Sequence, residues 1–247
     1  AHSGPPFATV IREDPTYQPL AALPQGFGAK VIPWPRDPEN GFQPDLPLLQ
    51  DLLQKHGPAL VVMTNLHNPS GAATSPGSLR EIADLVGRFG GLLLVDEIFR
   101  ELEPGLESVA TMGDHCISVA SVSKVFGISG LRVGWVIASP DILRPVQKLK
   151  EYVSAVNSPI CDLLALQALR QGDELVERAR AIKSANLPSM LAFCQERPEL
   201  EWVPSASLIA FCKVDHPLGS LGLCQRLRDD FGIMVSAGEH FGWPGYL

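Results

Sequence analysis

Apolar runs and helix-like stretches alternate over the first part of the chain. A stripe of leucines predicts a helix at residues 45–56, and Ser75 and Pro76 predict the start of another helix that runs to Phe89. Short runs that are apolar throughout predict strands at residues 8–11, 29–33, 59–64, 92–95, 117–120 and 133–138. Because apolar strands separated by helices are typical of sheets covered on both faces, we expect an α/β fold with a mostly parallel sheet.

After Pro140 the pattern becomes richer in helices. It predicts helices at residues 141–156, 162–196 and 221–231, with a break near residues 171–172, and strands at residues 207–214 and 233–236. We therefore expect a large domain over residues 1–150, followed by connecting helices and a smaller α+β C-terminal domain over residues 151–247.

Composition and charge exclude several classes of function. Hydrophobic residues make up 45% of the 247 residues and charged residues 19%, which is ordinary for a globular protein. The net charge of -7 argues against a nucleic-acid or anionic-membrane partner, and no apolar run is long enough to cross a bilayer. The six histidines and five cysteines lack the spacing of a metal site. We expect no metal, reduced cysteines and a cytoplasmic location.

Polar motifs follow the predicted strands, at the edge where parallel sheets bind ligands. Lys124 follows Asp96 by 28 residues, and Asp96 follows Asn68 by the same distance. The motifs are N-P-S-G at residues 68–71, D-E-I-F at 96–99, S-V-S-K at 121–124 and G-L-R-V-G at 130–134.

These residue types together suit one cofactor. A lysine amine forms a Schiff base with a carbonyl, and a buried aspartate is costly unless it is paired with a cation or hydrogen bonds; a protonated ring nitrogen would supply the cation. An asparagine amide donates to a phenolate oxygen, and serines with an arginine bind phosphate. Aldehyde, ring nitrogen, phenolate and phosphate together describe pyridoxal 5'-phosphate. Each motif alone has an ordinary explanation, such as a turn at residues 68–71 or a helix cap at Asp96; their order at successive strand ends favours the cofactor site.

In this order the motifs resemble the signature of the class I/II aminotransferases, which are fold-type-I pyridoxal-phosphate enzymes. The resemblance implies that Lys124 holds the cofactor through a Schiff base and moves a proton, that Asp96 pairs with the ring nitrogen, and that Asn68 donates to the ring oxygen. Tyr17, in E-D-P-T-Y at residues 13–17, is similar to the aromatic residue that stacks on the ring. The residues implied for the phosphate are Ser121, Ser123 and Arg132.

The resemblance also implies a reaction and partners. The expected activity is the exchange of an amino group between an amino acid and a 2-oxo acid, in a homodimer. Two alternatives stay open. One is another pyridoxal-phosphate reaction at the α-carbon, by a lyase, decarboxylase or cyclase, and it would not convert the cofactor to its amine form. The other is a non-catalytic cofactor-binding sensor domain of a regulator.

Two departures from the family pattern stand out. Phe99 occupies the place of a tyrosine that usually donates to the ring oxygen, so we expect Asn68 to act there alone. Family members also carry an upstream Gly/Ser-rich phosphate loop, and an arginine after a motif resembling residues 245–247, and neither lies within these 247 residues. We therefore expect the sequence to be truncated at both ends.

Overall fold

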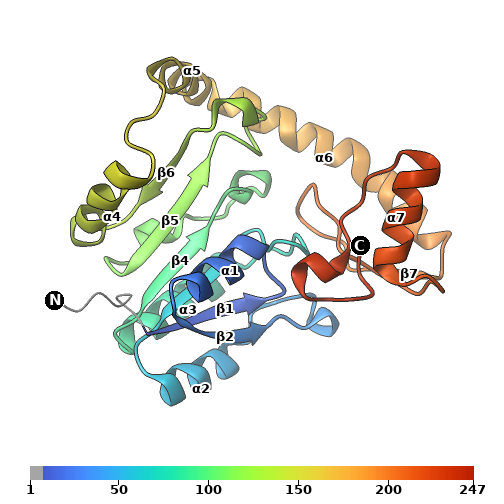
Figure 1. The fold of residues 1–247 in the computed structure, drawn as a ribbon. Coiled ribbons are helices and arrows are strands. Elements are labelled where there is room, and N and C mark those ends of the chain that lie inside the picture. Colours follow the sequence, from blue (N-terminus) through green and yellow to red (C-terminus); the bar gives the residue numbers. More distant parts are fainter. Residues whose placement is uncertain (1–7) are drawn as a thin grey trace.

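A six-stranded sheet forms the centre of the large lobe (Figure 1). The computed structural model describes residues 8–247. The strands lie in the order β2-β1-β3-β4-β5-β6; neighbours from β2 to β5 are parallel, and β6 is antiparallel to β5. Their bounds are β1 Thr9–Asp14, β2 Lys30–Pro35, β3 Leu60–Thr64, β4 Leu92–Asp96, β5 Cys116–Ser121 and β6 Gly134–Ile137.

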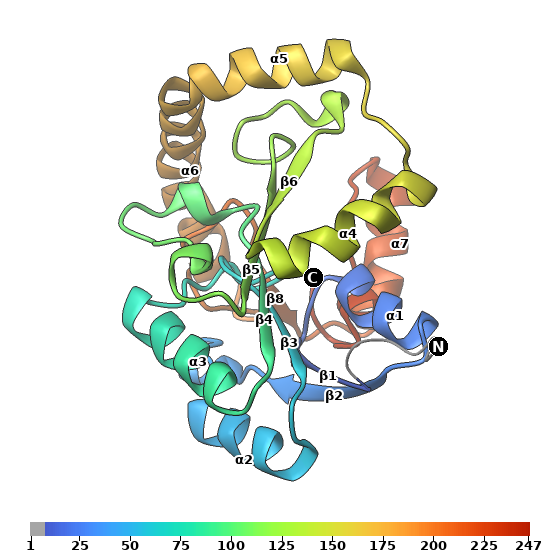
Figure 2. The same cartoon turned by 90° about the vertical axis from the view of Figure 1, so that its left-hand side faces the viewer.

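Helices cover both faces of this sheet. Figure 2 shows α2 and α3 on one side of the sheet and α1 and α4 on the other. Asp45 and Ser75 cap the starts of α2 and α3, where their side chains accept the N–H groups of Leu48 and Ser78. The helices are α1 Gln18–Gly26, α2 Leu46–His56, α3 Pro76–Arg88, α4 Pro140–Val153, α5 Pro159–Arg170, α6 Gly172–Gln195 and α7 Gly219–Phe231.

The predicted fold class is confirmed, and so are all six strands of the sheet. Most of the predicted strand ends lie within two residues of the observed ones. The two predicted helices of this part, α2 and α3, are also present. In the second half the long predicted helix divides into α5 and α6 at Gln171, as the break near residues 171–172 indicated.

The strand predictions of the second half are partly wrong. Only Cys212–Val214 (β8) of the predicted strand at residues 207–214 is extended, and it pairs with Leu200–Trp202 (β7), which the sequence pattern did not indicate. Residues 233–236 form no strand. The backbone N–H and carbonyl groups of Cys212 bond to those of Leu247, so residues at the end of the sequence pair with the other edge of β8. Without a neighbouring strand, residues 233–236 have no ladder to join.

Two apolar clusters position the loops at the ends of the strands. The larger cluster fills the space between the sheet and α2 and α3, and Ile11, Met63 and Leu93 lie at its centre. The smaller cluster lies beneath the loops that follow β3, β4 and β5, and it packs them against α6. Its buried members are Leu66, Leu102, Val125, Val176 and Ala179. The site-bearing loops are therefore anchored from below.

The C-terminal elements follow the long helix α6. Figure 1 shows β7 and α7 beyond the far end of α6, away from α4 and α5. The predicted boundary near residue 150 stays a prediction. No helix between residues 8 and 247 combines the length and apolar character needed to cross a membrane. Over the same residues, no group of three or more His, Cys, Asp or Glu side chains gathers in a way that could hold a metal ion.

Candidate active site

The carboxyl ends of four adjacent parallel strands meet at one edge of the sheet. β1, β3, β4 and β5 are neighbours in that order, and each leads into a segment that carries predicted site residues. The register places Thr64 beside Asp96, and Asp96 beside Val119. Residues separated by more than a hundred positions in the sequence, from Tyr17 to Lys124, are thereby brought to one place.

One cavity of about 400 Å³ lies at this edge. All eight residues predicted from the sequence line it: Tyr17, Asn68, Asp96, Phe99, Ser121, Ser123, Lys124 and Arg132. Their individual roles stay predictions, but their convergence is a property of the fold.

Asp96, at the tip of β4, is the acidic group of the cavity. Its Oδ1 accepts the backbone N–H of Ile98 at 3.0 Å, and no basic side chain among residues 8–247 forms a salt bridge with it. Burial raises the pKa of Asp96, the hydrogen bond from Ile98 lowers it, and the charge of Glu97 raises it. A cation in the cavity would offset the cost of burying this carboxylate.

Two serines and an arginine come from the segment that joins β5 to β6. Ser121 Oγ accepts the N–H of Ser123 at 3.2 Å, which folds the segment back just after β5. Arg132 follows the short 3-10 helix η4 (Ser129–Leu131) with φ of 57°, in the left-handed region that residues with a Cβ rarely adopt. Such a conformation, next to a cavity, is typical of functional segments. The segment between β5 and β6 thus contributes both hydroxyl and guanidinium groups to the cavity lining.

Lys124 is exposed, and its next neighbour along the chain is deeply buried. Val125 belongs to the smaller apolar cluster, so the backbone that carries Lys124 is anchored while its amine stays accessible. Phe99 is half-buried and packs against the same cluster. Tyr17, just after β1, also lines the cavity and leaves 47% of its surface exposed.

The sequence patterns missed three lining residues, Ile98, Val133 and Gly134. All three stand inside or next to the recognised motifs, where apolar side chains carry no chemical signal of their own. Gly134 has a packing reason: a Cβ there would lie 2.9 Å from the carbonyl oxygen of Ala120. A glycine is therefore required for β6 to lie against β5.

A second hollow differs in character. It measures about 470 Å³ and lies between α2 and α3, and charged surface side chains such as Asp51, Glu81 and Arg88 line it. None of the predicted site residues reaches it, so the cavity at the strand ends is the better candidate for a chemical site.

Comparisons with known proteins show which family and fold the chain is similar to. The model of the family "Aminotransferase class I and II" matches residues 3–247. Capreomycidine synthase of Streptomyces vinaceus is 32% identical over 94% of this chain and 61% of its own length. LL-diaminopimelate aminotransferase of Nitratidesulfovibrio vulgaris (strain DP4) is 27% identical over the same shares.

A solved structure shows the same fold. A PLP-dependent aminotransferase from Streptococcus suis 89-1591 superimposes with a TM-score of 0.92 and 29% identity, over 98% of this chain and 65% of that protein. The chain thus spans about 61% of the length of the curated relatives named above. With a family match over nearly all of its residues, the chain belongs to the class I and II aminotransferase family.

Proposed function

We propose that this chain forms the cofactor-binding core of a pyridoxal-phosphate-dependent aminotransferase, which moves an amino group between an amino acid and a 2-oxo acid. The observation that carries the proposal is the single cavity at the ends of four parallel strands, lined by a lysine, an aspartate, an asparagine, two serines and an arginine. Family membership supports the same activity.

The residues present fit pyridoxal phosphate. Asp96 is a largely buried carboxylate without a cationic partner among the described residues, which suits a protonated ring nitrogen. Ser121, Ser123 and Arg132 offer hydroxyl and guanidinium donors to a phosphate. Asn68 supplies an amide donor for the ring oxygen, and Tyr17 supplies an aromatic face. A cavity of about 400 Å³ lies within the size range of small-molecule sites.

The mechanism assigns distinct tasks to these side chains. When bound, pyridoxal phosphate supplies an electron sink for negative charge at the substrate α-carbon. Lys124 Nζ would be the covalent attachment point of the cofactor, and the same amine would take up and give back the proton of the substrate α-carbon. Asp96 holds a proton on the ring nitrogen, and the donors of Ser121 and Arg132 fix the orientation of the phosphate.

The direct test is covalent trapping on the protein as it is encoded. Pyridoxal phosphate is added, borohydride reduces the adduct, and peptide mapping locates the modified lysine. We expect modification at Lys124, loss of modification in Lys124→Ala, and normal modification in the control Lys148→Ala on the exposed face of α4. Modification spread over surface lysines, unchanged in Lys124→Ala, would contradict the site.

A second measurement separates amino transfer from other reactions at the α-carbon. One relative of this chain, capreomycidine synthase, is named as a synthase and not as an aminotransferase. We expect added amino acids to convert the bound cofactor to its amine form and added 2-oxo acids to convert it back. Product formation without this interconversion would assign the site to a lyase, decarboxylase or cyclase reaction instead. Binding without any reaction would favour a sensor domain.

The homodimer and the cytoplasmic location also belong to this proposal. Large apolar side chains on α4 and α5 are exposed, which supports a covered interface in the assembled protein.

A further inference from the structure

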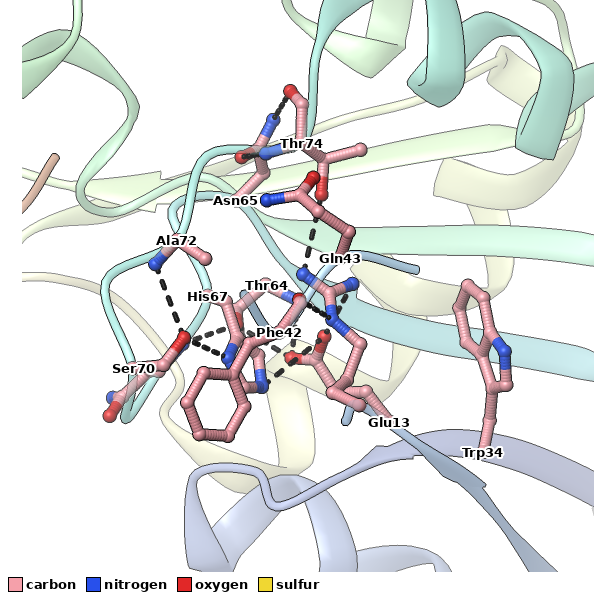
Figure 3. A network of polar contacts seen from close by, with 12 residues as sticks. Glu13, Trp34, Phe42, Gln43, Thr64, Asn65, His67, Ser70, Ala72 and Thr74 are labelled. Carbon is pink, nitrogen blue, oxygen red and sulfur yellow. Dashed lines mark hydrogen bonds and ion pairs between the residues drawn. The ribbon is translucent and has the colours of Figure 1, made fainter. Parts of the chain in front are cut away.

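Three ionisable side chains lie fully buried behind the candidate active site. Glu13 on β1, Arg36 just after β2, and His67 after β3 each expose 0% of their surface. Glu13 Oε2 lies 3.5 Å from Arg36 Nη1 and 3.8 Å from His67 Nε2. Figure 3 shows Glu13 and His67 close together, with Thr64, the last residue of β3, beside Glu13. The group does not line the cavity.

Hydrogen bonds connect this group to the segment that carries Asn68. Glu13 Oε1 accepts both the N–H of Thr64 at 2.8 Å and its hydroxyl at 2.6 Å. The Thr64 hydroxyl has one hydrogen, which it gives to Glu13, so its lone pairs are free to accept the N–H of Asn68 at 2.8 Å. Thr64 therefore relays the position of Glu13 to the backbone of Asn68.

His67 makes the corresponding connection to the segment that carries Tyr17. Its Nε2 lies 2.9 Å from the carbonyl oxygen of Pro15, and its Nδ1 lies 2.6 Å from Ser70 Oγ. Burial lowers the pKa of His67 well below its usual 6.5, and the charge of Arg36 lowers it further. The neutral ring then donates from Nε2 to Pro15 and accepts the Ser70 hydroxyl at Nδ1. One side chain thus joins the loops after β1 and β3.

Arg36 and Phe42 complete the enclosure of this group. Arg36 Nε donates to the carbonyl oxygen of Phe42 at 2.7 Å, and the Phe42 ring stacks on His67 with centroids 5.9 Å apart. A buried ion pair of this kind contributes little net stability compared with apolar residues of the same volume. The hydrogen bonds of Glu13 and His67, however, lead through Thr64 to Asn68 and directly to Pro15, on the segments that hold Asn68 and Tyr17.

We propose that Glu13, Arg36 and His67, with Thr64 as relay, are positioning residues. They fix the loops of Tyr17 and Asn68 relative to each other and thereby set how tightly the cavity holds the cofactor ring. The effect on the cofactor rests on the proposed function, whereas the coupling of the two loops does not.

The test uses variants that break one connection each. Thr64→Val removes the relay hydroxyl at nearly constant shape, and Thr64→Ser restores it. His67→Phe keeps the stacking on Phe42 but loses the contact with Pro15. Trp34→Phe is the matched control, because it loses a buried hydrogen bond of 2.9 Å, to the carbonyl oxygen of Asp45, that touches neither loop. Amide hydrogen exchange is measured without cofactor, and the dissociation constant of pyridoxal phosphate is measured by absorption titration.

We expect Thr64→Val to speed exchange at residues 64–71 and to raise the dissociation constant about tenfold, the effect of losing one ordinary hydrogen bond. His67→Phe should speed exchange at residues 14–17 as well. Thr64→Ser should stay within about twofold of the natural chain. The control should lower the melting temperature without changing exchange in either loop.

The positioning role is overturned if Thr64→Val and His67→Phe behave like Trp34→Phe in both measurements. If the natural chain binds no pyridoxal phosphate but both variants still speed exchange in their loops, the coupling of the loops holds and the proposed function fails.

Discussion

At the scale of single residues, Phe99 occupies the place where the resemblance to the family implies a tyrosine. A hydroxyl there would add a donor to the ring oxygen of the cofactor and stabilise its deprotonated form. We therefore expect Phe99→Tyr to lower the midpoint of the pH-dependent change in visible absorption of the bound cofactor by about one pH unit, since a hydrogen bond to a charged group contributes about 1.5–3 kcal/mol. Phe231→Tyr, on the exposed end of α7, is the control. Equal midpoints in Phe99→Tyr and the natural chain would show that the hydroxyl does not reach the ring oxygen.

Glu13 predicts a pH dependence of folding. Burial raises the pKa of Glu13 from 4.5 to about 7, against the lowering effects of Arg36 and the hydrogen bonds from Thr64, while the charge of Asp96, at the end of β4, also raises it. Between pH 4.5 and 7 the folded chain therefore binds more protons at Glu13 than the unfolded chain. The free energy of unfolding falls as pH rises through this window, by about 3 kcal/mol in total.

Urea denaturation at pH 5 and pH 8 checks this pH dependence. His67 titrates in the opposite sense, because its folded pKa is lowered and its contribution is lost as pH falls. The comparison with Glu13→Gln removes that contribution, since His67 is present in both chains. We expect the stability of the natural chain relative to Glu13→Gln to decrease by about 3 kcal/mol from pH 5 to pH 8. A constant difference would place the ionisation of Glu13 outside this range.

The sequence predicted the chemical role of a residue only where that residue stands in a recognisable motif. Asn68, Asp96 and Lys124 stand at the ends of apolar runs, and the parallel sheet brings such ends together. The pair of Glu13 and Arg36 gave no such signal. Arg36 lies among prolines in a segment that reads as a loop, and its acidic partner is on a neighbouring strand 23 residues earlier. Only the register of β1 beside β2 makes them neighbours.

At the scale of elements, Lys183 joins α6 to the loops beneath the candidate active site. Its Nζ donates to the carbonyl oxygens of Leu102 at 2.9 Å and Ala206 at 3.2 Å, and it contacts Glu103 at 3.2 Å. Lys183→Met keeps the apolar stem and leaves two carbonyl oxygens without this donor. We expect a loss of about 1–3 kcal/mol in the free energy of unfolding by urea denaturation. Lys148→Met on α4 should change it by less than about 0.5 kcal/mol; equal losses would show that Lys183 does not join these elements.

An element could be predicted where its own sequence pattern reflects its burial, and not where distant residues decide its structure. The inner strands of the sheet, β1, β3, β4 and β5, contain no exposed residue, so their apolar runs are easily recognised. The sequence pattern did not predict α1, because Pro24 lies inside it and proline normally ends a helix. Residues 233–236 have a strand-like composition but no neighbouring strand. Composition alone could not show this, because pairing is decided by distant residues at the end of the chain.

At the scale of the whole molecule, α4 and α5 expose a group of large apolar side chains. Tyr152 at the end of α4 is 89% exposed and Leu163 on α5 is 63% exposed, and Figure 1 shows both helices on the side away from α7. Other large apolar side chains exposed in this region are Leu149, Val153, Val156 and Ile160. Isolated globular proteins rarely expose a contiguous patch of this kind, so we expect a second copy of the chain to cover it.

The expected homodimer can be tested on this surface. A stable interface buries about 800 Å² per partner and tolerates few unpaired charges at its centre. We therefore expect sedimentation velocity to give a dimer for the natural chain, and a shift to monomer in the double variant Tyr152→Glu and Leu163→Glu. Phe231→Glu places the same charge on an apolar residue that is 65% exposed on α7, and should leave the dimer intact. A dimer that survives the double variant would place the interface elsewhere, and a natural chain that sediments as a monomer would contradict the dimer itself.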